Sequence, residues 1–256
     1  MTGPALAWHQ FRYDLIAFWR SPAAVFFTVL LPLIFLVIFN GLFGGERLEQ
    51  LGLQTSTYYV PGILTLAIAS ATMQSLAMHL TADRESGRLK RMRATPLPTW
   101  AFVAGRVGNS LATCVLMVAL VIAVGAIFYD VKVPTHTLPG LLVALAVGAF
   151  AFSCLGFALT ALIPSEEAAA PVANAVLLPL YFVSGVFIPE TEIPEGVLRV
   201  AEIFPVRHFF EALLTCFDPS TTGPGFSWGN LAIVAVWGIA GLLVAVRGFR
   251  WAPRRV

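Results

Sequence analysis

Six apolar segments that contain no Asp, Glu, Lys or Arg most constrain the fold of this chain. They lie at residues 22–43, 58–79, 107–128, 139–163, 171–188 and 228–246. A helix needs about 20 apolar residues to cross the hydrocarbon core of a bilayer, and the segments meet this requirement. The sequence therefore predicts an all-α integral membrane protein, in which residues 1–256 form one domain with six transmembrane helices. The fifth segment is the shortest, and Pro179 should kink it.

Composition supports lipid as the main solvent of the chain. Mean hydropathy is +0.81, and charged residues make up 12% of the sequence, against roughly 25% in soluble domains. A net charge of +2 gives no basis for binding nucleic acid. The three cysteines, Cys114, Cys154 and Cys216, are odd in number and scattered, which predicts neither a disulfide framework nor a metal site.

The basic residues between the apolar segments predict the orientation of the chain. Cytoplasmic loops of membrane proteins carry an excess of Lys and Arg. Of the 16 such residues here, twelve fall in segments on the same side as both termini and four fall on the other side. We therefore expect both termini in the cytoplasm.

Two amphipathic segments lie outside the apolar runs. Residues 5–20 place Trp8, Phe11, Leu15 and Phe18 at helical spacing, which predicts an interfacial helix within 1–21 on the inner leaflet; a poorly ordered tail is the alternative. Before the last span, residues 195–204 and 206–217 predict a short extracytoplasmic helical hairpin divided at Pro205. It is too apolar to float in water, so we expect it against the outer membrane surface or the other helices.

The segment TADRESGRLKRMRATPLP, residues 81–98, carries five of the 16 basic residues within ten positions. Its position between the second and third apolar segments places it in the cytosol. We predict a helix over 82–94 that Pro96 terminates, with Arg84, Arg88 and Arg91 on one stripe. Such a surface helix could dock a partner, or its charges could only hold the chain against anionic lipid headgroups. The spacing does not separate these alternatives.

Several chemistries have no visible residues in this sequence. A P-loop needs Gly-Lys-Ser/Thr, but the two lysines, Lys90 and Lys132, follow Leu89 and Val131. The apolar segments lack the titratable groups that proton-driven pumps use, although sodium coupling through backbone carbonyls stays open. Neither H-E-x-x-H nor G-x-S-x-G occurs. We therefore expect a chain that is not an enzyme and does not hydrolyse ATP itself.

Two motifs resemble those of the type 2 ABC exporter permeases, a family that includes bacterial drug-resistance permeases of the daunorubicin type. The first is F-I-P-E-x-x-I-P at Phe187–Pro194. The second is E-x-G-x-x-x-x-x-R-A-T-P in the first cytosolic loop, with Glu85, Gly87, Arg93, Ala94, Thr95 and Pro96. The six spans, the N-terminal surface helix and the helical outer segment also match this family. The resemblance covers nearly the whole chain.

The resemblance implies partners and roles beyond what spacing shows. In this family two permease subunits, identical or related, pair in the plasma membrane of a bacterium, and two separate ATPase subunits that bind ATP and Mg²⁺ dock below them. It implies that a coupling element to the ATPase contains Arg84, Glu85, Gly87, Arg88, Arg91 and Pro96. It also implies a substrate path, for which the candidate residues are Thr65, Gln74, Asn174 and Tyr181. Such polar residues can equally join helices to one another.

The expected function is that of a permease subunit that exports a hydrophobic or amphiphilic substrate, a drug or a lipid. The alternative is a membrane protein that needs no ATPase, either an ion-coupled secondary transporter or a structural subunit. A neighbouring gene for a soluble P-loop protein would favour the exporter. Transport driven by an ion gradient without nucleotide would favour the alternative.

Overall fold

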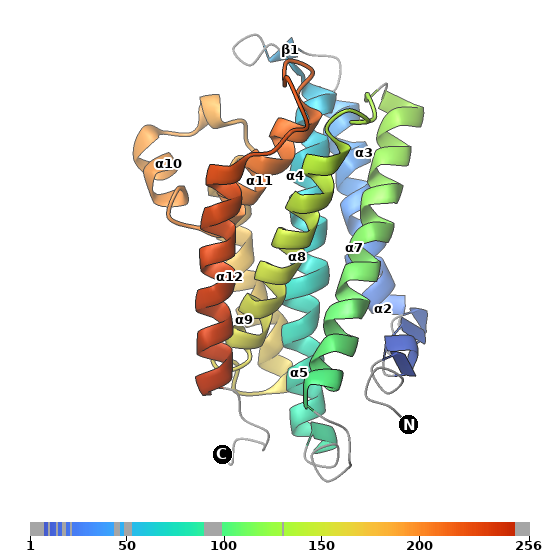
Figure 1. The fold of residues 1–256 in the computed structure, drawn as a ribbon, viewed down its shortest axis with the longest axis vertical. Coiled ribbons are helices and arrows are strands. Elements are labelled where there is room, and N and C mark those ends of the chain that lie inside the picture. The colour runs from blue at the N-terminus through green and yellow to red at the C-terminus, as the bar shows by residue number, and fades with distance from the viewer. Residues whose placement is uncertain are drawn as a thin grey trace.

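The computed structural model describes residues 8–9, 11–13, 15–16, 19–20, 22–43, 47–48, 53–89, 99–129 and 131–248. These residues form a bundle of long helices (Figure 1). In chain order the elements are α2 (Pro22–Val25), η1 (Phe26–Leu30), α3 (Leu31–Phe43), β1 (Arg47–Leu48), β2 (Leu53–Gln54), α4 (Thr55–Ala69), η2 (Ser70–Gln74), α5 (Ser75–Glu85), α7 (Thr99–Tyr129), α8 (Leu138–Leu159), α9 (Glu166–Val183), η3 (Glu190–Glu192), α10 (Glu195–Ala201), α11 (Pro205–Phe217) and α12 (Trp228–Gly248).

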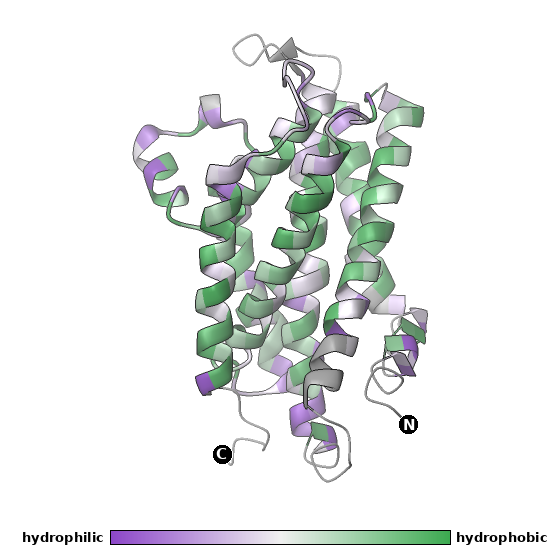
Figure 2. Cartoon of the chain, viewed as in Figure 1, coloured by the Kyte–Doolittle hydropathy of each residue, from purple (hydrophilic) through white to green (hydrophobic). Residues whose placement is uncertain are grey.

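The bundle has two distinct ends. The strands β1 and β2, which pair antiparallel, lie at one end together with α10, α11 and the connection from α7 to α8. The other end holds the end of α5, the connection from α8 to α9, the start of α2 and the end of α12 (Figure 1). In Figure 2, hydrophilic residues gather at these two ends, and an apolar zone separates them.

Four helical segments in the described part of the chain are long and apolar enough to cross a membrane. They are Thr55–Glu85, Gly105–Tyr129, Leu138–Leu159 and Trp228–Arg247. They match the predicted second, third, fourth and sixth spans. The protein is therefore a multi-pass helical membrane protein, as predicted, whereas the six-span topology stays a prediction.

The first and fifth predicted spans are the two whose bounds or lengths differ from the helices in the structure. The first contains a shorter apolar helix, Thr28–Phe43, which is part of a continuous run of α2, η1 and α3. The fifth was expected at 171–188, but α9 begins at Glu166 and ends at Val183. It begins early because Ser165 caps it, accepting a hydrogen bond from the Ala168 N–H at 3.3 Å.

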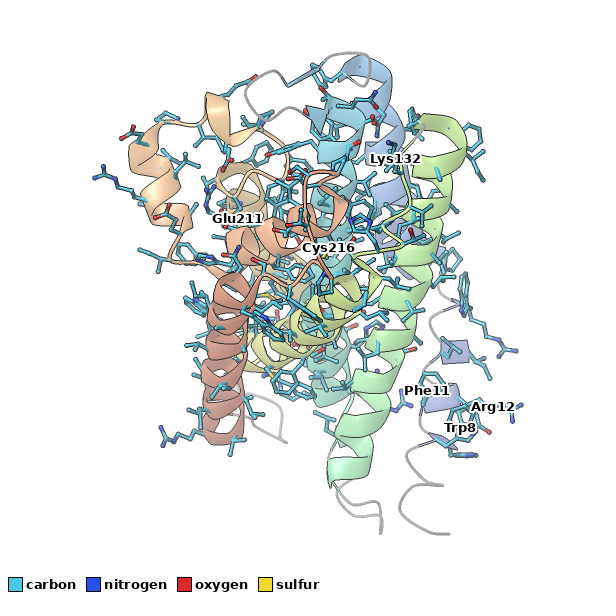
Figure 3. The ribbon with its side chains drawn as sticks, turned by 45° about the horizontal axis from the view of Figure 1, so that its top comes forward. Trp8, Phe11, Arg12, Lys132, Glu211 and Cys216 are labelled. Atoms are coloured by element: carbon cyan, nitrogen blue, oxygen red, sulfur yellow. The ribbon has the colours of Figure 1, made fainter. Side chains whose placement is uncertain are left out.

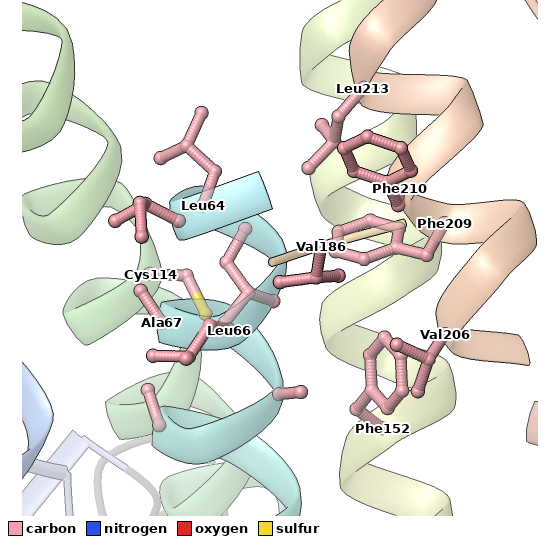
Figure 4. Packing of buried hydrophobic residues seen from close by; sticks show 14 of the residues in the cluster. Leu64, Leu66, Ala67, Cys114, Phe152, Val186, Val206, Phe209, Phe210 and Leu213 are labelled. Atoms are coloured by element: carbon pink, nitrogen blue, oxygen red, sulfur yellow. The ribbon is translucent and has the colours of Figure 1, made fainter. Parts of the chain in front are cut away.

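The helix α4 lies at the centre of the bundle, where it contacts α3, α7, α8 and α11. All its residues from Tyr58 to Ala69 are buried, as expected for a helix that is apolar all round. Figure 4 shows α4 residues beside Cys114 of α7, with the α11 ring of Phe209 close to Phe152 of α8. The two ring centroids are 5.4 Å apart in an edge-to-face arrangement. This core holds the long helices in fixed positions relative to one another.

Helices α8 and α12 pack closely along their length, and small residues make this approach possible. A Cβ added at Gly238 of α12 would lie 2.8 Å from the Cα of Ala151 in α8. Helices in membranes associate through such small residues because their backbones can approach closely.

The two amphipathic segments are helical where they are described. Helices α10 and α11 follow the predicted positions, and Pro205 is the first residue of α11. In the N-terminal segment the described residues 8–9, 11–13, 15–16 and 19 are helical. There Phe11 packs against Gly108 of α7, while Trp8 and Arg12 are exposed (Figure 3). The placement of this segment on a membrane surface stays a prediction.

Candidate functional site

Arg84 lies in the last turn of α5 and is buried, with only 3% of its surface exposed. Its guanidinium binds the connection between α8 and α9. Nη1 donates to the carbonyl oxygen of Thr160 at 3.0 Å, and Nη2 donates to those of Ile163 at 2.7 Å and Pro164 at 3.4 Å. The planar fork of an arginine can reach several acceptors in this way. Arg84 therefore joins α5 to the turn at 160–164.

The end of α8 explains why a cation is needed there. The last four carbonyls of a helix have no donor within the helix. The following turn supplies donors for them: Thr160 N to Gly156, Thr160 Oγ1 to Phe157, Ala161 N to Ala158, and Leu162 N and Ile163 N to Leu159. The carbonyls of the turn itself bind Arg84. A positive charge at this position also interacts favourably with the negative end of the α8 dipole.

Asp83, the neighbour of Arg84, makes the second connection at this end. Its carboxylate accepts a hydrogen bond from Nη2 of Arg106 in α7 and lies 3.4 Å from Nη1 of Arg88. The side chains of Asp83 and Arg106 are 10% and 9% exposed, so the Coulomb attraction between them is little screened by water. We call Asp83, Arg84, Arg88, Arg106 and the turn 160–164 the charged corner.

The predicted coupling helix over 82–94 differs from the structure. Residues 82–85 continue α5 from the second span, and the helix breaks at Ser86 and Gly87. Gly87 has φ +68°, a left-handed conformation that glycine adopts without strain and that commonly ends helices. The expected exposed stripe is therefore wrong at Arg84, which points inward to the turn 160–164.

The other predicted coupling residues fall into two groups. Glu85 and Arg88 are exposed, and more than half of the Arg88 side chain is in contact with solvent. Gly87 forms the turn between them. Arg91 and Pro96 lie outside the described residues. The exposed part of the element is thus held next to a buried part, because Arg88 contacts the same carboxylate that binds Arg106.

Three of the four predicted path residues meet between the second span and α9. Nε2 of Gln74 donates to Oδ1 of Asn174 at 2.9 Å. The hydroxyls of Ser70 and Tyr181 lie 3.4 Å apart. We call these two contacts the polar pairs. Because they join side chains of separate helices in an apolar zone, they hold α9 against the helix that ends in Arg84.

Thr65, the fourth predicted residue, is not part of this arrangement. Its hydroxyl donates to the carbonyl of Pro61 at 2.9 Å, one turn earlier in α4, and the residue is fully buried. A threonine in a helix often bonds back to the preceding turn in this way. Its hydroxyl is thus already used by its own helix.

The element η2 sets the orientation of Ser70 and Gln74. It is a π-helical turn, in which the N–H of Ser75 donates to the carbonyl of Ser70 five residues earlier. Such turns add one residue to an α-helix and frequently occur at functional sites. Sequence analysis missed both this turn and the participation of Ser70. A signal was present in the i, i+4 spacing of Ser70 and Gln74, which places both on one face.

The opposite end of the bundle has its own buried charges. Arg207 of α11 pairs with Glu190 at 3.0 Å and with Glu211 at 2.9 Å. The neighbouring His208 binds Asn230 of α12 through Nδ1 at 2.8 Å and the carbonyl of Glu202 through Nε2 at 2.7 Å. These contacts fix α11 between the turn at 187–194 and α12. Glu190, part of the predicted F-I-P-E motif, thus has a structural partner.

Cys216, also on α11, is a buried and unreactive thiol. Figure 3 shows it on the inner side of this helix, with Glu211 on the same element. Burial raises the pKa of the Cys216 thiol to about 11, because a thiolate would lose its hydration. At neutral pH the thiol stays protonated and is a poor nucleophile.

Comparison with known proteins assigns this arrangement to a family. Residues 5–217 match the family described as ABC-2 type transporter. The chain is 26% identical to a daunorubicin resistance ABC transporter permease protein, DrrB1, of Streptomyces coeruleorubidus, over 76% of this chain and 68% of that protein. It is 24% identical to the inner membrane transport permease YadH of Escherichia coli K12, over 78% and 72% of the two chains. It is 21% identical to a putative transport permease, YvfS, of Bacillus subtilis, over 74% and 76%.

The match covers the second span, the charged corner, α9 and the hairpin of α10 and α11. These relatives are permeases, and the family implies an ABC ATPase as partner. The structure and the comparisons together identify a membrane permease subunit. The chain belongs to the ABC-2 type transporter family.

Proposed function

We propose that this chain is a permease subunit of an ATP-driven exporter that moves a hydrophobic or amphiphilic substrate, a drug or a lipid, out of the cytoplasm. Two copies, or this chain and a related one, pair in the membrane, and two separate ATPase subunits hydrolyse ATP. The family supports the ATPase partnership, and the relative named for daunorubicin resistance supports a drug-like substrate. The absence of a P-loop from this sequence fits a motor on another chain.

The proposed topology has six spans in the plasma membrane of a bacterium, with both termini in the cytoplasm. Twelve of the 16 basic residues lie on the side assigned to the cytosol. The start of α2, the end of α12 and the end of α5 lie at one end of the bundle (Figure 1). For the first span, the unbroken helical run over 22–43 offers about 33 Å of helix at 1.5 Å per residue. For the fifth, α9 and the apolar segment after it, residues 184–188, complete the crossing.

The charged turn after α5 is proposed to receive the movement of the ATPase. The single observation that carries this proposal is the exposed segment from Glu85 to Arg88, which directly continues a helix buried at the centre of the bundle. A partner that binds this segment would act on the second span without an intervening flexible linker. Arg91 and Pro96 are proposed to extend the same surface.

The substrate path is proposed along the face that α9 shares with the second span. Gln74, Asn174 and Tyr181 supply hydrogen-bonding groups there within an apolar wall. Such a surface suits an amphiphilic molecule with a few polar groups. In this proposal Thr65 makes no substrate contact, since its hydroxyl bonds to its own helix.

Co-purification with the ATPase tests the proposed coupling. We would express the chain with its proposed ABC ATPase partner and compare wild type with Glu85→Ala and Arg88→Glu. The expected result is that Arg88→Glu weakens ATPase association by about tenfold or more, because charge reversal places like charges together, and that daunorubicin no longer stimulates ATP hydrolysis. The matched control is Arg199→Glu, a charge reversal on the exposed α10 at the opposite end, which should change neither.

Three outcomes would contradict the proposed function. The first is unchanged association and hydrolysis in both coupling variants. The second is transport of daunorubicin into vesicles on an ion gradient without nucleotide, which would favour a secondary transporter. The third is labelling of residues 81–98 by an impermeant reagent applied outside intact cells.

A further inference from the structure

The charged corner and the polar pairs are two ends of one rigid connection. Both involve α5 and the turn of η2 before it, and both contact α9 or the turn that leads into it. Gln74 and Arg84 are ten residues apart, which is about three turns of helix. At one end Gln74 binds Asn174 within α9. At the other end Arg84 binds the turn 160–164, which continues into α9 at Glu166.

We infer that Arg84 is a positioning residue that makes α5 and the α8–α9 turn move as one body, so that displacement of the exposed segment 85–88 reaches α9. This inference rests on the proposed function, because it needs an ATPase that displaces the segment. It assigns to Arg84 a role other than docking. The exposed Arg88 would contact the partner, and the buried Arg84 would carry the movement inward.

The chemistry of the contact explains why arginine suits this role. Two nitrogens of one guanidinium bind carbonyls at 3.0 and 2.7 Å, which fixes both the distance and the orientation of the turn relative to α5. A lysine would keep the charge but would present a single ammonium group without the planar fork. Arg84→Lys therefore removes the geometric restraint and retains the cation.

The neighbouring contact shows that α5 is also held on its other side. Asp83 binds Arg106 of α7, while Arg84 binds the end of α8. The adjacent residues Asp83 and Arg84 thus restrain α5 against two different neighbouring helices. A displacement of α5 would carry α7 through Asp83 and α9 through Arg84, and only the second connection is changed by Arg84→Lys.

Environment-sensitive fluorescence at two introduced cysteines tests the inference. One reporter is Ser86→Cys, within the exposed segment 85–88, and the other is Leu178→Cys, on the exposed side of α9. Each is labelled with bimane in a background that lacks Cys114, Cys154 and Cys216, which are buried. The complex with its ATPase is measured without nucleotide and with ATP and vanadate. This readout needs no knowledge of the substrate.

In the complex with Arg84 intact, we expect nucleotide to shift the emission at both positions. In Arg84→Lys, we expect the shift at position 86 to persist, while most of the shift at position 178 is lost. ATPase association should be retained. Arg247→Lys, which changes another arginine at the same end of the bundle, should leave both shifts unchanged.

A second variant keeps the test valid if Arg84→Lys fails to fold. Pro164→Gly leaves Arg84 in place but loosens the turn that it holds, and we expect it to lose the shift at position 178 as well. An equal response at position 178 in the variants and wild type would overturn the inference. Loss of the shift at both positions with loss of the ATPase would make Arg84 a docking residue. No ATPase binding by wild type would instead overturn the proposed function, and the inference with it.

Discussion

Two arginines are buried at opposite ends of this bundle, and they have different kinds of partners. Arg207 is bound by the carboxylates of Glu190 and Glu211, which are 34% and 30% exposed. Arg84 binds backbone carbonyl oxygens of the buried residues Thr160 and Ile163 and, at longer range, that of Pro164. The first arrangement neutralises a charge with acidic side chains that also reach water. The second supplies donors to carbonyls of the turn that follows another helix.

The sequence distance between partners differs as well. Arg207 contacts residues at most 17 positions away, within the region of α10 and α11. Arg84 contacts residues 76 to 80 positions away. The contacts of Arg207 therefore stabilise a local arrangement, whereas those of Arg84 hold together segments that would otherwise be independent. The comparison indicates that the corner is the place where a small change should affect distant helices.

The largest effect on stability is expected at the buried pair of the charged corner. Asp83→Ala leaves the Arg106 guanidinium buried without its carboxylate, which costs about 3 to 5 kcal/mol in comparable cases. We expect a lower yield of monodisperse protein and earlier thermal unfolding, measured by fluorescence-detected size exclusion after heating. The double variant Asp83→Leu with Arg106→Leu should recover most of this loss. An Asp83→Ala variant as stable as wild type would contradict the pairing.

Replacing each of the two arginines by alanine should cause different losses of stability. Arg84→Ala removes the guanidinium donors from the carbonyls of Thr160 and Ile163, two buried residues, so we expect a loss of about 3 kcal/mol. Arg207→Ala leaves two carboxylates that water can solvate, so we expect about 1 to 2 kcal/mol. The same heating assay compares them directly. Equal losses would mean that the partner type does not matter.

The polar pair of Gln74 and Asn174 should contribute less to stability than either arginine. Hydrogen bonds between helices in membranes contribute about 0.6 kcal/mol on average. Gln74→Leu therefore should lower the unfolding temperature only slightly, while it changes the transport of daunorubicin in reconstituted vesicles. The conservative Gln74→Asn provides the control. If Gln74→Leu left transport unchanged, the polar pair would be a helix contact without a place on the path.

The smallest effect on stability is expected at Arg88. Its side chain is largely exposed, and its contact with Asp83 is 3.4 Å long, so Arg88→Gln should cost at most about 1 kcal/mol. Its ATPase association, measured by co-purification, should nevertheless fall. A destabilised Arg88→Gln protein would show that this side chain belongs to the buried part of the corner.

Local patterns in the sequence predicted much of the fold. Apolar runs identified the long helices, since a helix in lipid must be apolar over its length. Pro205 marked the start of α11, whereas α10 ends at Ala201, before the predicted end at residue 204. The start of α9 was missed because Ser165 and the two following glutamates form a polar cap that an apolar window leaves out.

The candidate site was less predictable, since its contacts join distant segments. Spacing along one helix placed Arg84 with Arg88, but the conformation of Gly87 breaks that periodicity. Nothing in one sequence shows that Arg84 faces residues 160–164, because that depends on which helices are neighbours. The pairing of Gln74 with Asn174 likewise depends on which helices are neighbours. Composition supplied the candidate residues, and only the packing supplied their partners.

The π-helical turn η2 has a consequence for how this chain can change over evolution. It holds one residue more than an α-helical turn, and each residue of an α-helix rotates the chain by about 100°. Deleting one position within 70–74 would therefore turn every later side chain of that helix about a third of a revolution. Asp83 would leave α7 and Arg84 would leave the end of α8 together. Insertions and deletions in this stretch should consequently be inherited only in combination with compensating changes elsewhere.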